Sequence, residues 1–227
     1  MTAVGMLAVA SATFVGTHFL MSHPLRTPLI GLIGEKAFTG LYSLVALATF
    51  AWIFIAYGPA NAEAPRPLWE AGRVWWIVAT LLMWLGSILL VGSLRRNPAF
   101  PRPGRTIRSI DAPRGVYAIT RHPMMWAFTL WAIVHAITNP THASLIVCAA
   151  IAILALFGAA SQDAKKRRLI GGPWQDWVKR TSFLPFGRGP ALPDAFAFLV
   201  GTLIFLAATW AHGALGYRPV GIWAFLA

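Results

Sequence analysis

Apolar residues along the chain gather in six long runs separated by polar stretches. The runs cover roughly residues 3–22, 37–57, 74–94, 123–140, 143–160 and 195–215. Each is about as long as a helix must be to cross a hydrocarbon core about 30 Å thick at 1.5 Å per residue. The pattern predicts an all-α, polytopic transmembrane bundle of about six spans, formed by a single domain. The fourth and fifth runs are the shortest, and we expect them to form a helical hairpin.

The charges of the connecting segments alternate from one segment to the next. Segments 95–122 and 161–194 each carry seven basic residues, against one and three aspartates, whereas segments 58–73 and 139–142 carry no net formal charge. Basic loops stay on the cytoplasmic side of a membrane. We therefore expect a multi-pass protein of the cell inner membrane with both termini on the outer side. The Pro/Arg-rich stretch at 97–113 is expected to be an extended loop.

Composition supports a membrane protein and argues against a nucleic-acid binder. Of 227 residues, 57% are hydrophobic and only 11% are charged, and the mean hydropathy is +0.63; a soluble domain carries about 25% charged residues. The net charge of +12 lies mainly in two loops beside the apolar runs. The positive-inside rule accounts for charge in that place, and the expected partner is the lipid bilayer, with anionic lipid at the basic loops.

Histidine is the residue type that could carry chemistry within the apolar runs. No run holds a pair of carboxylates, and the chain has no HExxH motif or phosphate-binding glycine loop. His18, His135 and His212 lie inside predicted spans, and His122 begins the fourth. A histidine in lipid requires a partner, and neutral imidazole suits a haem iron. These histidines are therefore candidate haem b ligands, with hydrogen bonding to a neighbouring helix as the structural alternative.

Depth in the membrane restricts which histidines could share an iron. His122 and His135 lie roughly 20 Å apart along one helix, on faces about 140° apart, so they cannot share one. With the expected topology, the pairs at equal depth are His18 with His122 and His135 with His212. Arg121 would lie at headgroup depth, where it could hold an anion; the alternative is that Arg121 anchors the start of the helix at the interface.

Several stretches, in order along the chain, resemble the NnrU family of bacterial membrane proteins. They are GEKAFTGLYSLV (34–45), ITRHPMMW (119–126), LWAIVH (130–135), DAKKRR (163–168) and RTSFLPF (180–186). The family is named for its association with nitrite and nitric oxide reduction. It is similar to the plastid 15-cis-zeta-carotene isomerase, a membrane enzyme that uses haem b. The resemblance implies that His18 and His135 ligate the haem, a pairing that differs from the pairs matched by depth.

A fainter resemblance connects the chain to membrane methyltransferases that use S-adenosylmethionine. In both, a segment like Tyr117 to Pro123 precedes a helical hairpin, and aromatic residues like those of WQDW at 174–177 precede a proline, here Pro185. The acidic pair that these enzymes have after the hairpin is not matched in this chain. Three functions are thus open. The first is a haem protein. It would either support nitrite or nitric oxide reduction together with a redox partner, or isomerise a lipid-soluble polyene. The others are a methyltransferase, which we favour less than the isomerase, and a non-catalytic assembly factor.

Overall fold

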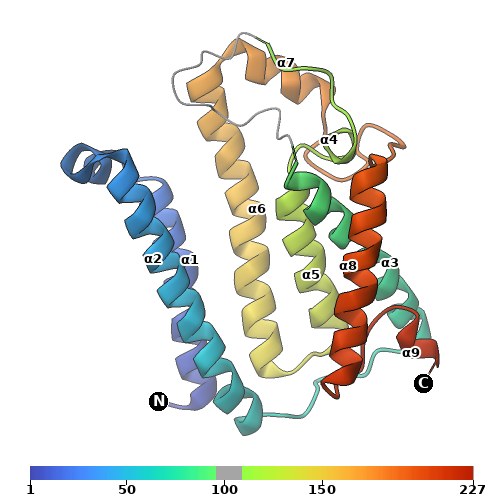
Figure 1. Cartoon of the computed structure of the whole chain (residues 1–227). Coiled ribbons are helices and arrows are strands. Elements are labelled where there is room, and N and C mark those ends of the chain that lie inside the picture. The colour runs from blue at the N-terminus through green and yellow to red at the C-terminus, as the bar shows by residue number, and fades with distance from the viewer. Residues whose placement is uncertain (96–108, 227) are drawn as a thin grey trace. The chain divides into compact units, whose positions relative to one another are not determined.

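The computed structural model describes residues 1–95 and 109–226, and these residues form nine helices and no strand (Figure 1). The helices are α1 (Ala3–Ser22), α2 (Arg26–Glu63), α3 (Arg73–Ser93), α4 (Val116–Ile119), α5 (Pro123–Thr138), α6 (His142–Ile170), α7 (Gly172–Arg180), α8 (Ala195–Ala214) and α9 (Trp223–Leu226). The all-α class is confirmed. Most of the extended loop expected at 97–113 lies outside the described residues.

Among the described residues, five helices are long and apolar enough to cross a membrane: α1, α2, α3, α6 and α8. Helix α5 has 16 residues, which extend roughly 24 Å and so fall short of a hydrocarbon core about 30 Å thick. Large apolar side chains on the spans face outward, as for Phe54, which is 79% exposed. Lipid solvates such surface without cost. The chain is a multi-pass membrane protein, while the sixth span and the sides of the termini stay predictions.

Two segments expected as loops contain helices. Helix α2 begins at Arg26, within the segment 23–36 that connects the first two apolar runs. Gly34 interrupts the helix with a φ of 80°, a value that residues with a Cβ rarely adopt. The apolar run at 37–57 is thus the part of α2 beyond this break. Helix α6 continues ten residues past the end of the apolar run at 160, to Ile170, and α7 follows after Gly171. The start of α2 and the end of α6 lie in polar stretches of the sequence. Hydropathy alone predicts connecting segments at these places.

Contacts divide the chain into two compact units. Unit 1 comprises Met1–Glu70 and His135–Leu154. In it, α1 packs along α2. Its core consists of small and apolar side chains: Leu7, Ala10, Phe14, Ile53, Ala56, Ala60 and Ala143. The prediction of one domain over residues 1–227 stays a prediction.

Unit 2 comprises Ala71–Val134 and Ala155–Ala227. Helices α3 and α8 pack closely because Gly201 lies against the backbone of α3: a Cβ added there would be 2.7 Å from the Cα of Ile88. At the start of α8, the Asp194 carboxylate accepts a hydrogen bond from the backbone N–H of Ala197, at 3.1 Å. The core of this unit also buries Trp174 and Trp177 of α7.

Candidate functional site

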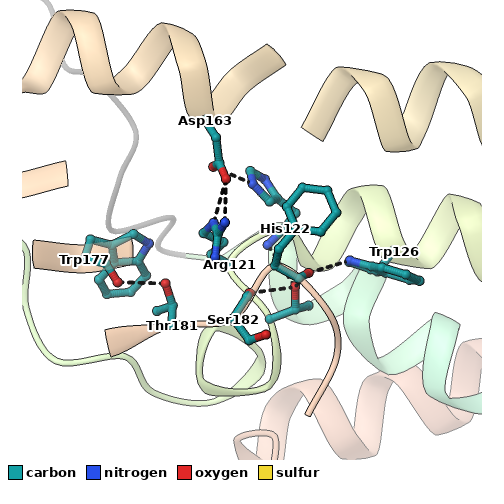
Figure 2. Close-up of polar contacts among 9 residues, drawn as sticks. Arg121, His122, Trp126, Asp163, Trp177, Thr181 and Ser182 are labelled. Atoms are coloured by element: carbon teal, nitrogen blue, oxygen red, sulfur yellow. Dashed lines mark hydrogen bonds and ion pairs between the residues drawn. The ribbon is translucent and has the colours of Figure 1, made fainter. Parts of the chain in front are cut away.

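A buried polar cluster in unit 2 joins the start of α5 to the C-terminal part of α6. The carboxylate of Asp163, in α6, accepts hydrogen bonds from Nε and Nη2 of Arg121, at 2.8 and 2.6 Å (Figure 2). Both side chains are 11% exposed. Charge-assisted bonds of this geometry are about twice as strong as neutral ones. Arg121 therefore holds a carboxylate of its own chain, where the sequence had suggested an external anion or an interfacial anchor.

His122 completes the cluster. Its Nε2 lies 2.7 Å from the second oxygen of Asp163, and its ring meets the ring of Phe183 edge-on. The residue is 4% exposed. Burial lowers the pKa of His122 below its ordinary value, although the Asp163 carboxylate acts in the opposite direction. The neutral ring then donates Nε2–H to Asp163 and keeps its lone pair on Nδ1.

Helix α4 fixes the chain just before this cluster. Gly115 begins the turn with a φ of 57°, and Tyr117 donates its hydroxyl to the backbone carbonyl of Ser93, at the end of α3, at 3.3 Å. Burial raises the pKa of Tyr117 to about 12, so its phenol stays protonated and keeps this donor. Thr120 is extended and ends α4. The backbone thus leaves the helix in a defined direction at Arg121.

The segment after α7 pairs with this stretch through main-chain bonds. The N–H of Arg121 donates to the carbonyl of Ser182, at 2.9 Å. The carbonyl of Phe183 accepts from the Thr120 hydroxyl at 2.8 Å and from the Trp126 indole at 2.7 Å (Figure 2). Three stretches far apart in the sequence therefore converge at the cluster.

His18, in α1 of unit 1, is half-buried between two aromatic rings. Its Nδ1 lies 2.7 Å from the backbone carbonyl of Phe14, and its ring lies 4.3 Å from the ring of Phe14 and 5.6 Å from that of Tyr42, between centroids. With Nδ1 as the donor, Nε2 carries the lone pair. A haem-ligating histidine needs such an arrangement, in which a carbonyl fixes the ring and the other nitrogen coordinates.

His135 lies at the other end of unit 1. The turn that follows it is tied to the C-terminal part of α2, because the hydroxyl of Thr141 donates to Oδ1 of Asn61, at 3.0 Å. His18, in contrast, contacts Tyr42 on the same helix. Residues 42 to 61 of a helix extend roughly 28 Å. In this arrangement His18 and His135 lie too far apart to hold the same iron.

The pairs matched by depth each connect residues of different units, and they stay predictions. His212, in α8, is exposed and has its Nδ1 2.7 Å from the carbonyl of Ala208. His122 has its Nε2 on Asp163, so coordination through that atom would cost this bond. Among the described residues, no group of three or more His, Cys, Asp or Glu side chains could hold a metal ion. Of the candidate ligands, His18 combines an Nδ1 held by a carbonyl with a half-buried position between two aromatic rings.

Sequence reasoning missed Asp163 as the partner of Arg121 and His122. The sequence contains a signal for this contact. If two antiparallel helices are joined by a turn at residues 139–142, residues 122 and 163 lie at about the same height along them. Asp163 is followed by Lys165 and Lys166, and the basic run concealed its importance.

The fold and these contacts define an all-helical, multi-pass membrane protein with a buried Arg–His–Asp cluster at the start of α5. The family model described as NnrU protein matches residues 6–219. The chain therefore belongs to the NnrU family, and the resemblance seen in the sequence is confirmed.

One curated relative is the chloroplastic 15-cis-zeta-carotene isomerase of Arabidopsis thaliana. It is 28% identical over 205 residues, which are 80% of this chain and 52% of the relative. The chain thus spans about half the length of this relative. No solved structure matches the chain.

Proposed function

We propose that the protein is a membrane isomerase that converts a double bond of a lipid-soluble polyene between cis and trans. The observation that carries this proposal is the similarity to an isomerase over 80% of the chain, within a family match from residue 6 to residue 219. The apolar helices suit such a substrate, because a hydrocarbon polyene dissolves in the bilayer and needs no polar group for binding. In this role the enzyme receives its substrate from lipid.

The second part of the proposal is that haem b binds through His18. The fixed Nδ1 leaves Nε2 for the iron, and the rings of Phe14 and Tyr42 would limit rotation of the imidazole. When bound, the haem would supply a metal centre able to interact with the π-system of the polyene. His135 would not be the second ligand to the same iron, because it lies at the other end of unit 1.

A haem protein that supports nitrite or nitric oxide reduction in the cell inner membrane is a second candidate. The same His18 geometry favours it, since a histidine-held haem serves redox chemistry as well as isomerisation. The two candidates differ in what the reduced protein does. Isomerisation changes the polyene without net electron transfer, whereas nitric oxide reduction consumes electrons.

Absorption spectroscopy and a polyene assay test both parts. The full chain is purified in detergent from haem-supplied cells, and His18→Ala is compared with His23→Ala. His23 is a matched control because it lies outside the apolar runs and its Nδ1 also contacts the carbonyl four residues earlier, at 3.3 Å. We expect a Soret band in the wild type and in His23→Ala, and its loss in His18→Ala.

The reduced protein is then incubated with 15-cis-zeta-carotene in liposomes without oxygen, and the isomers are separated by chromatography. We expect conversion above that given by free haem. Conversion by a protein without haem would remove the haem proposal and leave the isomerase. A haem-loaded protein that leaves the polyene unchanged but consumes nitric oxide with a reductant would replace the isomerase by the second candidate.

A further inference from the structure

The junction of α6 and α7 holds more positive charge than its carboxylate can neutralise. Asp163 is already engaged by Arg121 and His122. Lys166, one turn further along α6, is half-buried, and among the described residues it has no carboxylate within 4.0 Å. With His122 neutral, Arg121, Lys166 and Asp163 together carry a net charge of +1. The face of Trp174 offsets part of the cost of this half-buried ammonium, and an anion within reach would offset more.

Two buried indoles of α7 add donors, one of them beside Lys166. Trp174 and Trp177 lie on one face of α7 and are 0% and 1% exposed. Within the described part of the chain, neither indole N–H has a hydrogen-bond partner. The ammonium of Lys166 lies 4.8 Å from the centroid of a Trp174 ring, so the cation and this indole belong to one locus. In Figure 2 the indole nitrogen of Trp177 is on the side of its ring nearer to Arg121.

An indole N–H and an ammonium can only donate hydrogen bonds. Buried donors without acceptors are rare in folded proteins, and each calls for an explanation. An anion with several oxygens would supply the missing acceptors and the missing charge together.

We propose that Lys166, Trp174 and Trp177 form a binding site for a phosphate group, carried by a lipid headgroup or by a free phosphate. Lysine binds phosphate as a point charge, and the indoles add directed donors. Phosphate is preferred to a carboxylate because it presents more acceptor oxygens to three separate donors. A hydrocarbon polyene has no acceptor at all, so this site serves a ligand other than the substrate proposed above and does not depend on that proposal.

Binding measurements on the full chain test this site. The protein is held in a neutral detergent at constant ionic strength, and two probes are titrated separately: inorganic phosphate, and phosphatidic acid in mixed micelles. Phosphatidylcholine micelles, which carry no net charge, are the reference for the second probe. We expect saturable binding of at least one probe. Binding of both assigns the site to the phosphate group itself, and binding of phosphatidic acid alone assigns it to a lipid headgroup.

The variants connect binding to the named residues. Lys166→Met keeps the length of the side chain and removes its charge, and we expect the dissociation constant to rise about tenfold or more. Trp174→Phe keeps an aromatic ring and removes the N–H, with an expected rise of several-fold. Lys179→Met is the matched control, since Lys179 is a basic residue of α7 that is 75% exposed and paired with Asp176; its binding should match the wild type.

The proposal is overturned if the wild type binds neither probe, or if Lys179→Met weakens binding as much as Lys166→Met does. The first result would show that the donors need no anion, and the second that bulk positive charge explains the effect. Trp174→Phe decides the matter if Lys166→Met does not fold: unchanged affinity in a monodisperse Trp174→Phe protein would also overturn it.

Discussion

Replacing Asp163 by alanine should destabilise the protein more than removing Asp163 and Arg121 together. The carboxylate accepts bonds from Arg121 at 2.8 and 2.6 Å and from His122 at 2.7 Å. Its loss leaves the guanidinium, whose side chain is 11% exposed, without a counter-charge. Removing one partner of a buried pair costs about 3–5 kcal/mol. Because a shift of 1 kcal/mol moves the melting temperature by about 2–4 °C at this size, the expected fall is roughly 6–20 °C.

The double variant Arg121→Gln, Asp163→Ala tests the physical reason. Without Arg121 no charge is stranded, and His122 is neutral at pH 7.5 because burial lowers its pKa. We therefore expect the double variant to recover about 1–3 kcal/mol relative to Asp163→Ala alone.

Thermal melting in detergent, followed by gel filtration of the protein that stays dispersed, measures Asp163→Ala, Arg121→Gln and the double variant under one condition. Apparent melting temperatures of a membrane protein depend on the detergent, so only differences within that detergent are compared. The reasoning is refuted if Asp163→Ala melts within about 2 °C of the wild type. It is also refuted if the losses in the two single variants simply add in the double variant, since distant, independent sites behave in that way.

Three further predictions follow from other contacts. Gly201→Ala should lower the stability by about 1–3 kcal/mol in melting experiments, because its Cβ would lie 2.7 Å from the Cα of Ile88. Gly16→Ala is the control: nothing lies within 4 Å of its Cβ, so it should be neutral or slightly stabilising, and equal melting of the two variants would contradict the close packing. His122 has a lowered pKa in the fold, so the unfolded chain binds more protons below about pH 6.5, and the free energy of unfolding should fall as the pH drops from 7 to 5; His122→Gln should flatten this dependence, and an unchanged slope would exclude His122 as its source. Asp194→Ala should cost about 0.5–2 kcal/mol by loss of the helix cap, seen as faster hydrogen exchange at the first amides of α8; unchanged exchange there would deny the cap a role.

Hydropathy predicted the fold class well because lipid imposes a long apolar run on every span. It was less accurate where the helix leaves the apolar region. The last turns of α6 are helical although they contain Lys165 to Arg168, since intrahelical hydrogen bonds continue in a polar setting whenever tertiary contacts support them. Helix α5 posed the opposite problem: its run reads to residue 140, but the helix ends at Thr138, before Asn139 and Pro140.

The candidate site was only partly predictable. Arg121 and His122 stood out because Arg-His-Pro begins a helix, and the structure shows both of them in a buried cluster. Asp163 was missed because a single sequence does not show that residues 42 positions apart are in contact. The ligand pairing implied by family resemblance, His18 with His135, could not be checked from the sequence, since it depends on which ends of two helices face one another.

The contacts of Arg121 also bear on how the protein is made. Its partner carboxylate is 42 residues later in the chain, and its backbone N–H donates to Ser182, which is synthesised later still. A ribosome that has released residue 121 has therefore not yet delivered either partner. Until the segment around residue 182 emerges, this arginine must stay in water or among headgroups. A chain truncated before that point should therefore be a preferred target for membrane quality-control proteases.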